Sequence, residues 1–327
     1  MDANTVATHL CGFTREPHLA AMSDAFAPPN VAPEGRYSSD RGYLTLAARH
    51  RMYLEMAVDL ALSLRDWNLE PVSLVVDARL REAAERHYHS VFDEILSLPE
   101  EYDFGRALKY SVGELTPYRR TLFIDADTLS LGPLEETWRR LAGRRFAMMG
   151  ETLLPDHEGL HHGRPAHYWC RRFGLQRYFK THSAVFFFEK EEGQRVLAEC
   201  LAAYRDRAYS RLRWTGDEVG FAIVADRSSI DTFPGPSPIL WNEQLASIDL
   251  SAPEAPLLHM LGNPPRSTVD RLVASVADRR RRAGIPGDSE SYWRLKAASS
   301  NTGVIRGRLF PLGRRLLDLR WKLRREV

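Results

Sequence analysis

Lysine is scarce in this sequence of 327 residues, because only five of the 45 basic residues are lysines and the rest are arginines. We attribute this bias to the base composition of the gene and not to a binding code. Positive charge is also nearly balanced by negative charge, with a formal net charge of +2. This balance argues against nucleic acid as a partner of the whole molecule.

Cysteine is equally rare. Cys11, Cys170 and Cys200 form no CxxC pair and are odd in number, which excludes a disulfide framework or a zinc knuckle and favours a reducing compartment. No apolar run has the length of a membrane span, and the opening "MDANTVATHLCG" lacks a basic segment followed by an apolar one. We therefore expect a cytoplasmic protein without a secretion signal.

Hydrophobic residues make up 44% of the chain, enough for a sizeable core. Composition divides the chain into three parts. Residues 1–41 form an N-terminal extension that ends in a linker rich in Pro and Gly. Residues 42–266 are expected to form one α/β domain, and residues 267–327 a basic, helical C-terminal extension.

The order of the predicted elements favours a mostly parallel sheet flanked by helices. A strand at 42–48, a helix at 51–67 and a strand ending at Asp77 form a βαβ unit. The patterns that follow predict helices at 104–115, 134–142, 191–205, 215–225 and 270–284, strands at 121–125, 145–150 and 183–190, and a loop at 151–172.

The stretch "PYRRTLFIDADTLSLGP" places Asp125 and Asp127 directly after a buried strand. Open α/β sheets bind ligands at the carboxyl ends of their strands. Carboxylate oxygens suit Mg²⁺ or Mn²⁺, which commonly bridge protein acids to substrate phosphates. By itself the pair is also compatible with a turn that carries two solvated acids.

Two later segments add chemistry. His259 in "PLLHMLGNPP" offers a nitrogen ligand that Mn²⁺ accepts, although a lone histidine is more often packed or solvated. Asp217 and Glu218 in "TGDEVGFAIV" begin a predicted helix, where acids are also favoured by the helix dipole alone.

Taken in order, "TPYRRTLFIDADT", "THSAVFFFEK", "GDEVGFAIV" and "HMLGNPP" resemble the GT-A nucleotide-sugar glycosyltransferases. The nearest likeness is to the family-8 type, which includes glycogenin and bacterial galactosyltransferases, and it covers residues 42–266. The resemblance implies a hexosyltransferase that uses Mn²⁺ (or Mg²⁺) and a nucleoside-diphosphate sugar of the UDP-sugar kind. It favours a retaining reaction, whereas the residues alone leave retaining and inverting outcomes open. The acceptor would be a glycan, a lipid-linked molecule or a small molecule.

The resemblance also implies roles for individual residues. Asp125, Asp127 and His259 would hold the metal. Asp217 would lie on the acceptor or sugar side, and with Glu218 it is a candidate base for an inverting reaction. The donor would contact Tyr53 (nucleobase), Lys109, His182, Gly262 (diphosphate) and Arg266.

The chain departs from the family pattern at several of these positions. Arg49 and His50 stand where the family tends to have acids that contact uracil and ribose, so the nucleobase stays open. His182 replaces an Asn, and Pro265 replaces a Lys for which Arg266 is a possible substitute. Glu218 stands where the family often has Gln. Because of these changes, the chain could alternatively be a catalytically degenerate scaffold that binds a partner.

Two other enzyme classes share short motifs with the chain. "DADT" resembles the DxDxT opening of haloacid-dehalogenase phosphatases in its two acids, but there the motif lies near the start of the domain. "HEGLHHGRPAH" at 157–167 contains HExxH, which binds zinc only from a helix. Its Gly and Pro residues predict instead a polar loop near the acceptor.

The tail at 306–327 sets four leucines on one helical stripe among eight basic residues. Such a helix contacts a membrane surface or a partner, or packs on the protein's own core. The first possibility would place the protein peripherally on the inner membrane face and favour a lipid-linked acceptor.

Overall fold

The computed structural model describes residues 39–102, 107–205, 216–228, 230–240, 252–260, 264–287 and 289–299. Its centre is a seven-stranded sheet with the order β10-β6-β9-β4-β1-β2-β3. The strands are β1 (Ser39–Ala47), β2 (Val72–Val76), β3 (Glu94–Ser97), β4 (Tyr118–Ile124), β6 (Phe146–Leu153), β9 (Tyr178–Glu189) and β10 (Asp231–Thr232). A smaller sheet contains β5 (Thr128–Ser130), β11 (Ile239–Leu240) and β12 (Leu257–His259).

The central sheet is mixed and mostly parallel. β3, β2, β1 and β4 run in one direction, and β9 runs against both of its neighbours, β4 and β6. The chain moves from β1 outward to β3 and later returns to place β4 on the other side of β1. The strand order therefore reverses between β1 and β4, which is where open α/β sheets bind ligands. The predicted α/β class is confirmed.

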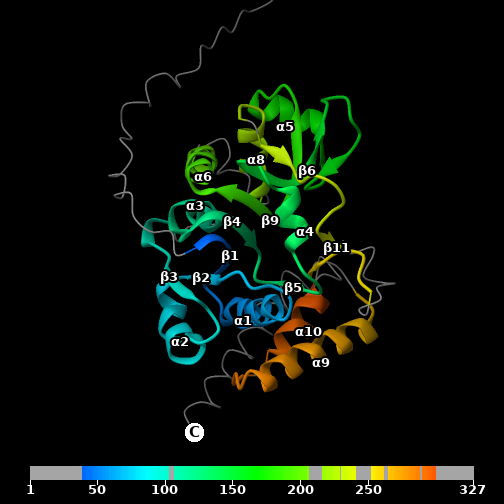
Figure 1. Ribbon diagram of the computed structural model, residues 1–327. Coiled ribbons are helices and arrows are strands. Elements are labelled where there is room, and N and C mark those ends of the chain that lie inside the picture. The colour runs from blue at the N-terminus through cyan, green and yellow to red at the C-terminus, as the bar shows by residue number, and fades with distance from the viewer. Residues whose placement is uncertain are drawn as a thin grey trace, which may run out of the picture. The chain divides into compact units, whose positions relative to one another are not determined.

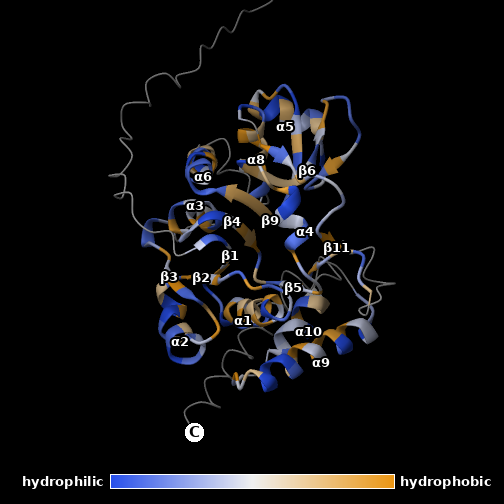
Figure 2. Ribbon diagram, in the orientation of Figure 1, coloured by the Kyte–Doolittle hydropathy of each residue, from blue (hydrophilic) through white to orange (hydrophobic). Residues whose placement is uncertain are grey.

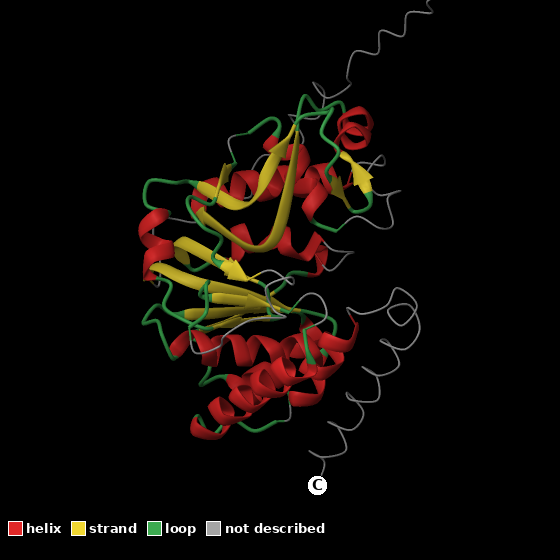
Figure 3. Cartoon of the chain, turned by 90° about the vertical axis from the view of Figure 1, so that its right-hand side faces the viewer, coloured by secondary structure: helices red, strands yellow, loops and turns green. Residues whose placement is uncertain are grey.

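Helices cover both faces of this sheet (Figures 1 and 3). One face carries α1 (Arg51–Arg65), α2 (Ala78–Tyr88), α9 (Arg266–Arg282) and α10 (Glu290–Ser299), with α1 in contact with both α9 and α10. The other face carries α3 (Val112–Leu115), α6 (Lys190–Arg205) and α8 (Glu218–Ala225). The described residues also contain α4 (Glu135–Arg140) and α5 (Ala166–Phe173). No helix of the described ranges is long and apolar enough to cross a membrane.

The strands are hydrophobic because side chains from both of their faces are buried. Along β9, Phe187 packs with the core under α1, whereas Phe186 and Phe188 belong to the core under α6 and α8. This alternation follows from the two-residue period of a strand. Figure 2 shows β4 and β9 as hydrophobic and much of α2 and α9 as hydrophilic.

The structure corrects two of the predicted elements. The helix expected at 104–115 is, over its described part, a 3₁₀ helix η2 (Ala107–Ser111) that leads into the single turn of α3. The loop expected at 151–172 contains the end of β6, a hairpin of β7 (Leu160–His161) and β8 (Arg164–Pro165), and most of α5. His157 and Glu158 lie in no helix, as predicted, so the HExxH motif lacks the helix on which zinc binding depends.

The division of the chain at residues 41 and 266 stays a prediction, and the tail at 306–327 lies outside the described residues. The structure does show how α9 is held. Arg280 of α9 is 4% exposed and forms ion pairs with Glu55 and Asp59 of α1, which are 0% and 1% exposed. Trp293 of α10 donates a hydrogen bond of 2.7 Å to Asp59. Tyr88 adds a bond to Glu55.

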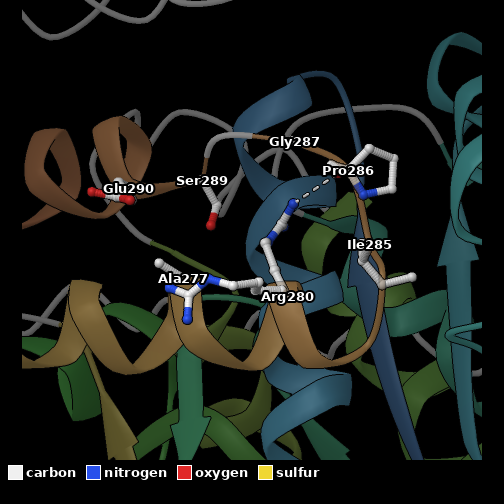
Figure 4. Close-up of a pocket in the computed structure, with 8 residues that line it drawn as sticks. Ala277, Arg280, Ile285, Pro286, Gly287, Ser289 and Glu290 are labelled. Carbon is white, nitrogen blue, oxygen red and sulfur yellow. Dashed lines mark hydrogen bonds between the residues drawn. The ribbon is translucent and has the colours of Figure 1, made fainter.

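Arg280 also lines a hollow of about 320 Å³ at the junction of α9 and α10 (Figure 4). One of its guanidinium nitrogens donates to the carbonyl oxygen of Pro286 at 3.4 Å, as the dashed line in Figure 4 marks. Burial favours the neutral forms of Glu55 and Asp59, whereas the guanidinium of Arg280 favours their charged forms. The pKa of Glu55 lies below its usual value, and burial raises the pKa of Asp59. The ion pairs therefore join α9 to α1 in the core.

We predict that Arg280→Met lowers the free energy of unfolding by about 3–5 kcal/mol, because it leaves the buried Asp59 without its cation and Glu55 with only Arg51 as a cationic partner. Urea denaturation followed by circular dichroism measures the change. The matched control is Arg281→Met. Arg281 is 73% exposed and forms a surface ion pair with Asp278, so we expect the free energy of unfolding to change by less than about 0.5 kcal/mol. Equal effects of the two variants would contradict a structural role for the Arg280 network.

Candidate active site

The carboxyl end of β4 brings Asp125, Asp127 and His259 together. The backbone N–H of Asp125 donates to Ala184 of β9 at 2.8 Å, which fixes the point where the strand ends. The chain then turns into β5, which pairs antiparallel with β12 so that Thr128 faces His259. As a result, Nε2 of His259 lies 3.1 Å from Oδ1 of Asp127, although 132 positions separate them in the sequence.

Lys109 joins Asp125 to Asp217. Its ammonium lies 2.9 Å from a carboxylate oxygen of each residue, and its side chain is only 14% exposed. It also donates to the carbonyl oxygen and the hydroxyl of Ser183 at 3.0 Å. Lys109 stands on η2, so the short 3₁₀ segment that replaces the predicted helix is what carries this cation to the end of β4.

Asp217 is positioned by the packing of α8 against η2. It is the residue before α8, and its carbonyl oxygen accepts a bond of 2.5 Å from the hydroxyl of Tyr110. Gly220 permits this approach, because a Cβ at that position would lie 2.1 Å from the same hydroxyl. A side chain at position 220 would displace Tyr110, and the hydrogen bond that holds the backbone of Asp217 would be lost.

Asp127 has a second partner that sequence reasoning missed. Lys296 of α10 places its ammonium 2.5 Å from Oδ2 of Asp127. Burial opposes ionisation of Asp127, but Lys296 and His259 outweigh it and hold the pKa of this carboxyl well below its usual value. Burial raises the pKa of Asp125, against the opposing effect of Lys109. The rarity of lysine could have indicated both residues, because two of the five lysines lie at this site, one beside Asp125 and the other beside Asp127.

Glu218 lies beside Asp217 but has its own partners. One carboxylate oxygen is 3.1 Å from Nε2 of His161 and 3.0 Å from Nε2 of His162, and the other accepts a bond of 3.4 Å from the backbone of Ser183. Burial raises the pKa of Glu218, but the two histidines outweigh it, so the pKa lies below its usual value. The histidines come from the β7–β8 hairpin, which the sequence predicted only as a polar loop.

His182 lies on β9, with its ring centroid 5.2 Å from that of His259 in an edge-on arrangement. Burial lowers the pKa of His182 to about 4, and the neighbouring His259 acts in the same direction. His182 is therefore neutral at neutral pH and adds no positive charge beside the carboxylates.

The remaining predicted donor contacts are Tyr53, Arg266 and Gly262. Tyr53, near the start of α1, is partly buried against the core under α1. Arg266 is 93% exposed and pairs with Asp270 at 3.9 Å, so the structure does not bring it to the carboxylates. Gly262 lies outside the described residues. At the end of β1, Arg49 has a left-handed backbone (φ 69°), and its N–H donates to Asp77 at 2.6 Å.

The residues at the end of β4 fit a divalent ion. One ligand atom each from Asp125, Asp127 and His259 lies within 4.8 Å of the others. Two carboxylates and an imidazole are donors that Mn²⁺ accepts, and the oxygens also suit Mg²⁺. A second group of possible ligands, His161, His162 and Glu218, is equally compact, and its contacts are accounted for as hydrogen bonds to one carboxylate.

Sheet order and site position together define the GT-A fold, as the sequence resemblance implied. Two solved structures share it. The galactosyltransferase LgtC in complex with donor and acceptor sugar analogs matches with a TM-score of 0.53 and 11% identity, over 78% of this chain and 99% of that chain. The glycosyltransferase GlyE of Streptococcus pneumoniae TIGR4 matches with a TM-score of 0.50 and 12% identity, over 77% of this chain and 66% of that chain.

No protein-family model matches the sequence, and no curated protein matches it either. At these identities the two structures establish the fold of the chain. The assignment of a reaction and a substrate depends on the residues at the end of β4.

We predict that Lys109→Met lowers the free energy of unfolding by about 2 kcal/mol, because Asp125 and Asp217 then face each other without a cation. Urea denaturation at low salt measures this loss. Adding Asp217→Asn to the variant should restore part of it, since one of the two repelling charges is removed.

The control for this prediction is Lys180→Met, another of the five lysines. Lys180 is 36% exposed and pairs with Glu151 at the surface, so its removal should change stability by less than about 0.5 kcal/mol. A double variant that is less stable than Lys109→Met alone would show that repulsion between the acids is not the cause.

Proposed function

We propose that this protein is a glycosyltransferase that moves a hexosyl group from a nucleoside-diphosphate sugar, such as a UDP-sugar, to a glycan, lipid-linked or small-molecule acceptor. The observation that carries the proposal is the convergence of Asp125, Asp127 and His259 beside Lys109, at the strand end where a GT-A sheet binds its ligand. We further propose Mn²⁺, or else Mg²⁺, as the ion held by these three residues.

The charges of the site suit a reaction in which a diphosphate leaves. When the bond between sugar and phosphate breaks, negative charge builds up on the diphosphate, and fixed positive groups stabilise it. A bound divalent ion would supply the largest share of this stabilisation as a Lewis acid. Lys109 holds Asp125 and Asp217 in place on one side of that position.

The partners of the two candidate bases favour a retaining reaction. An inverting transfer needs a carboxylate that is available to take the proton of the acceptor hydroxyl. Asp217 is paired with Lys109, and Glu218 with His161 and His162. The pKa of Glu218 is lowered by its histidine partners, which makes it a weaker base, and the carboxylate of Asp217 is already engaged by Lys109. We propose that Asp217 instead orients the sugar or the acceptor.

Likeness to the family-8 type, a cytoplasmic location and contact of the tail at 306–327 with the inner membrane face remain part of this proposal. Of the two alternatives, the DxDxT phosphatase has no support, because both solved structures named above are glycosyltransferases. A degenerate scaffold is distinguished by activity: an enzyme of this class slowly hydrolyses its sugar donor when the ion is present, whereas a scaffold binds the donor and leaves it intact.

Thermal unfolding in the presence of nucleotides tests the donor class. We expect one of UDP, GDP, ADP or CDP, together with Mn²⁺, to stabilise the protein by about 2.7 kcal/mol at 100 times its Kd. EDTA should remove most of this stabilisation, since the ion bridges the diphosphate to the carboxylates. Asp127→Asn should remove it as well.

The control is Asp278→Asn on α9, since Asp278 is a half-exposed acid that pairs with Arg281 and Arg282. This variant should respond to nucleotide and Mn²⁺ as the unaltered protein does. The proposal is wrong if no nucleoside diphosphate stabilises the protein with or without Mn²⁺. If Asp127→Asn keeps the full metal-dependent effect, the ion binds elsewhere.

A further inference from the structure

Lys296 enters the site from a part of the chain that lies beyond the family-like segment. It stands on α10, and its ammonium lies 2.5 Å from Asp127 while its side chain is only 14% exposed. The other oxygen of Asp127 faces His259 at 3.1 Å. The ammonium is therefore next to the position that an ion held by Asp127 and His259 would occupy.

The attachment of α10 to the rest of the protein does not require Lys296. Trp293, one turn earlier on the same helix face, is 1% exposed and donates to Asp59 of α1. Tyr292 is buried as well, and Arg294 pairs with Asp270 of α9. These contacts hold the helix, and an ion pair that leaves water adds little net stability. The anchored helix instead serves to hold the ammonium at a fixed point.

The chemistry of an ammonium suits a diphosphate. A lysine ammonium has three N–H donors and a full positive charge, and it forms charge-assisted hydrogen bonds with phosphate oxygens. With Lys109 beside Asp125, a cation stands next to each acid of the pair. Elsewhere the chain uses arginine for nearly all of its positive charge, whereas an ammonium is a compact point charge with three rotatable donors.

We propose that Lys296 binds the diphosphate of the sugar donor, so that α10 completes the donor site from the C-terminal side. This inference rests on the proposed function. It assigns to Lys296 the part that the sequence suggested for Arg266, which the structure leaves at the surface. It also makes the diphosphate, and not the nucleoside, the portion of the donor that α10 recognises.

Calorimetric titration at saturating Mn²⁺ tests the proposal. The probes are UDP, GDP, ADP and CDP and their monophosphates, applied to the full chain and to Lys296→Met. We expect the Kd of the diphosphate that binds the unaltered protein best to rise at least about tenfold, since a buried partner of its charge is lost. The Kd of the matching monophosphate should change less than about twofold.

Two further variants make the result specific. Arg294→Met removes an exposed charge from the same helix and should leave both constants unchanged. Lys296→Arg, which keeps the charge in a different shape, should give an intermediate Kd for the diphosphate. If Lys296→Met fails to fold, Lys296→Gln takes its place, and a diphosphate Kd equal to that of the unaltered protein would contradict the proposal.

The outcomes separate this inference from the proposed function. If the unaltered protein binds no nucleoside diphosphate, both are wrong. If it binds one and Lys296→Met binds it equally well, only the role of Lys296 is wrong. Tighter Mn²⁺ binding by Lys296→Met without loss of diphosphate affinity would show that the lysine only neutralises Asp127. Equal loss of diphosphate and monophosphate affinity would also overturn the proposal, because the ammonium would then not act on the diphosphate.

Discussion

Crowding of negative charge at the end of β4 is the constraint on which the rest of the site depends. Asp125, Asp127 and Asp217 lie close together with little exposure to water, and like charges in such a place need cations near them. Lys109 pairs with two of the three acids, and Lys296 with the remaining one. Lys109, Asp217 and Lys296 belong to η2, the start of α8 and α10, which are far apart in the sequence. Their ion pairs with one another and with the acids that follow β4 hold these elements together at the end of that strand.

A second group of buried charges makes this arrangement rigid. Arg280 joins α9 to Glu55 and Asp59 of α1, and Trp293 of α10 donates to Asp59 as well. Lys296 follows Trp293 by one helical turn, so the anchor and the ammonium share one face of α10. The C-terminal helices thus contribute both to the core under α1 and to the site. A phosphate-binding group held in this way loses little conformational freedom when its ligand arrives.

Most of the fold could be predicted because its signals are local. The period-two and continuous apolar patterns of β1, β2, β4 and β9, with the helical pattern between β1 and β2, indicate a parallel sheet. The errors fall where tertiary contacts outweigh local preference. Residues 151–172 are rich in His, Gly and Pro, yet α5 forms there because Trp169 is buried against Tyr178 with their rings stacked at 5.8 Å. The segment at 107–115 is shaped by the close approach of Tyr110 to Gly220.

For the site, the amino-acid sequence indicates the ligand types and their order: the acid pair after a buried strand, the acids at the start of α8 and a late histidine. Each of these is an intrinsic property of a short segment. Which groups face one another depends on long-range packing, because a pair such as Lys296 and Asp127 is formed by the packing of α10 on α1 and by no feature near either residue. Arg266, the first residue of α9, lies at the surface, although its position in the sequence had favoured it for the donor.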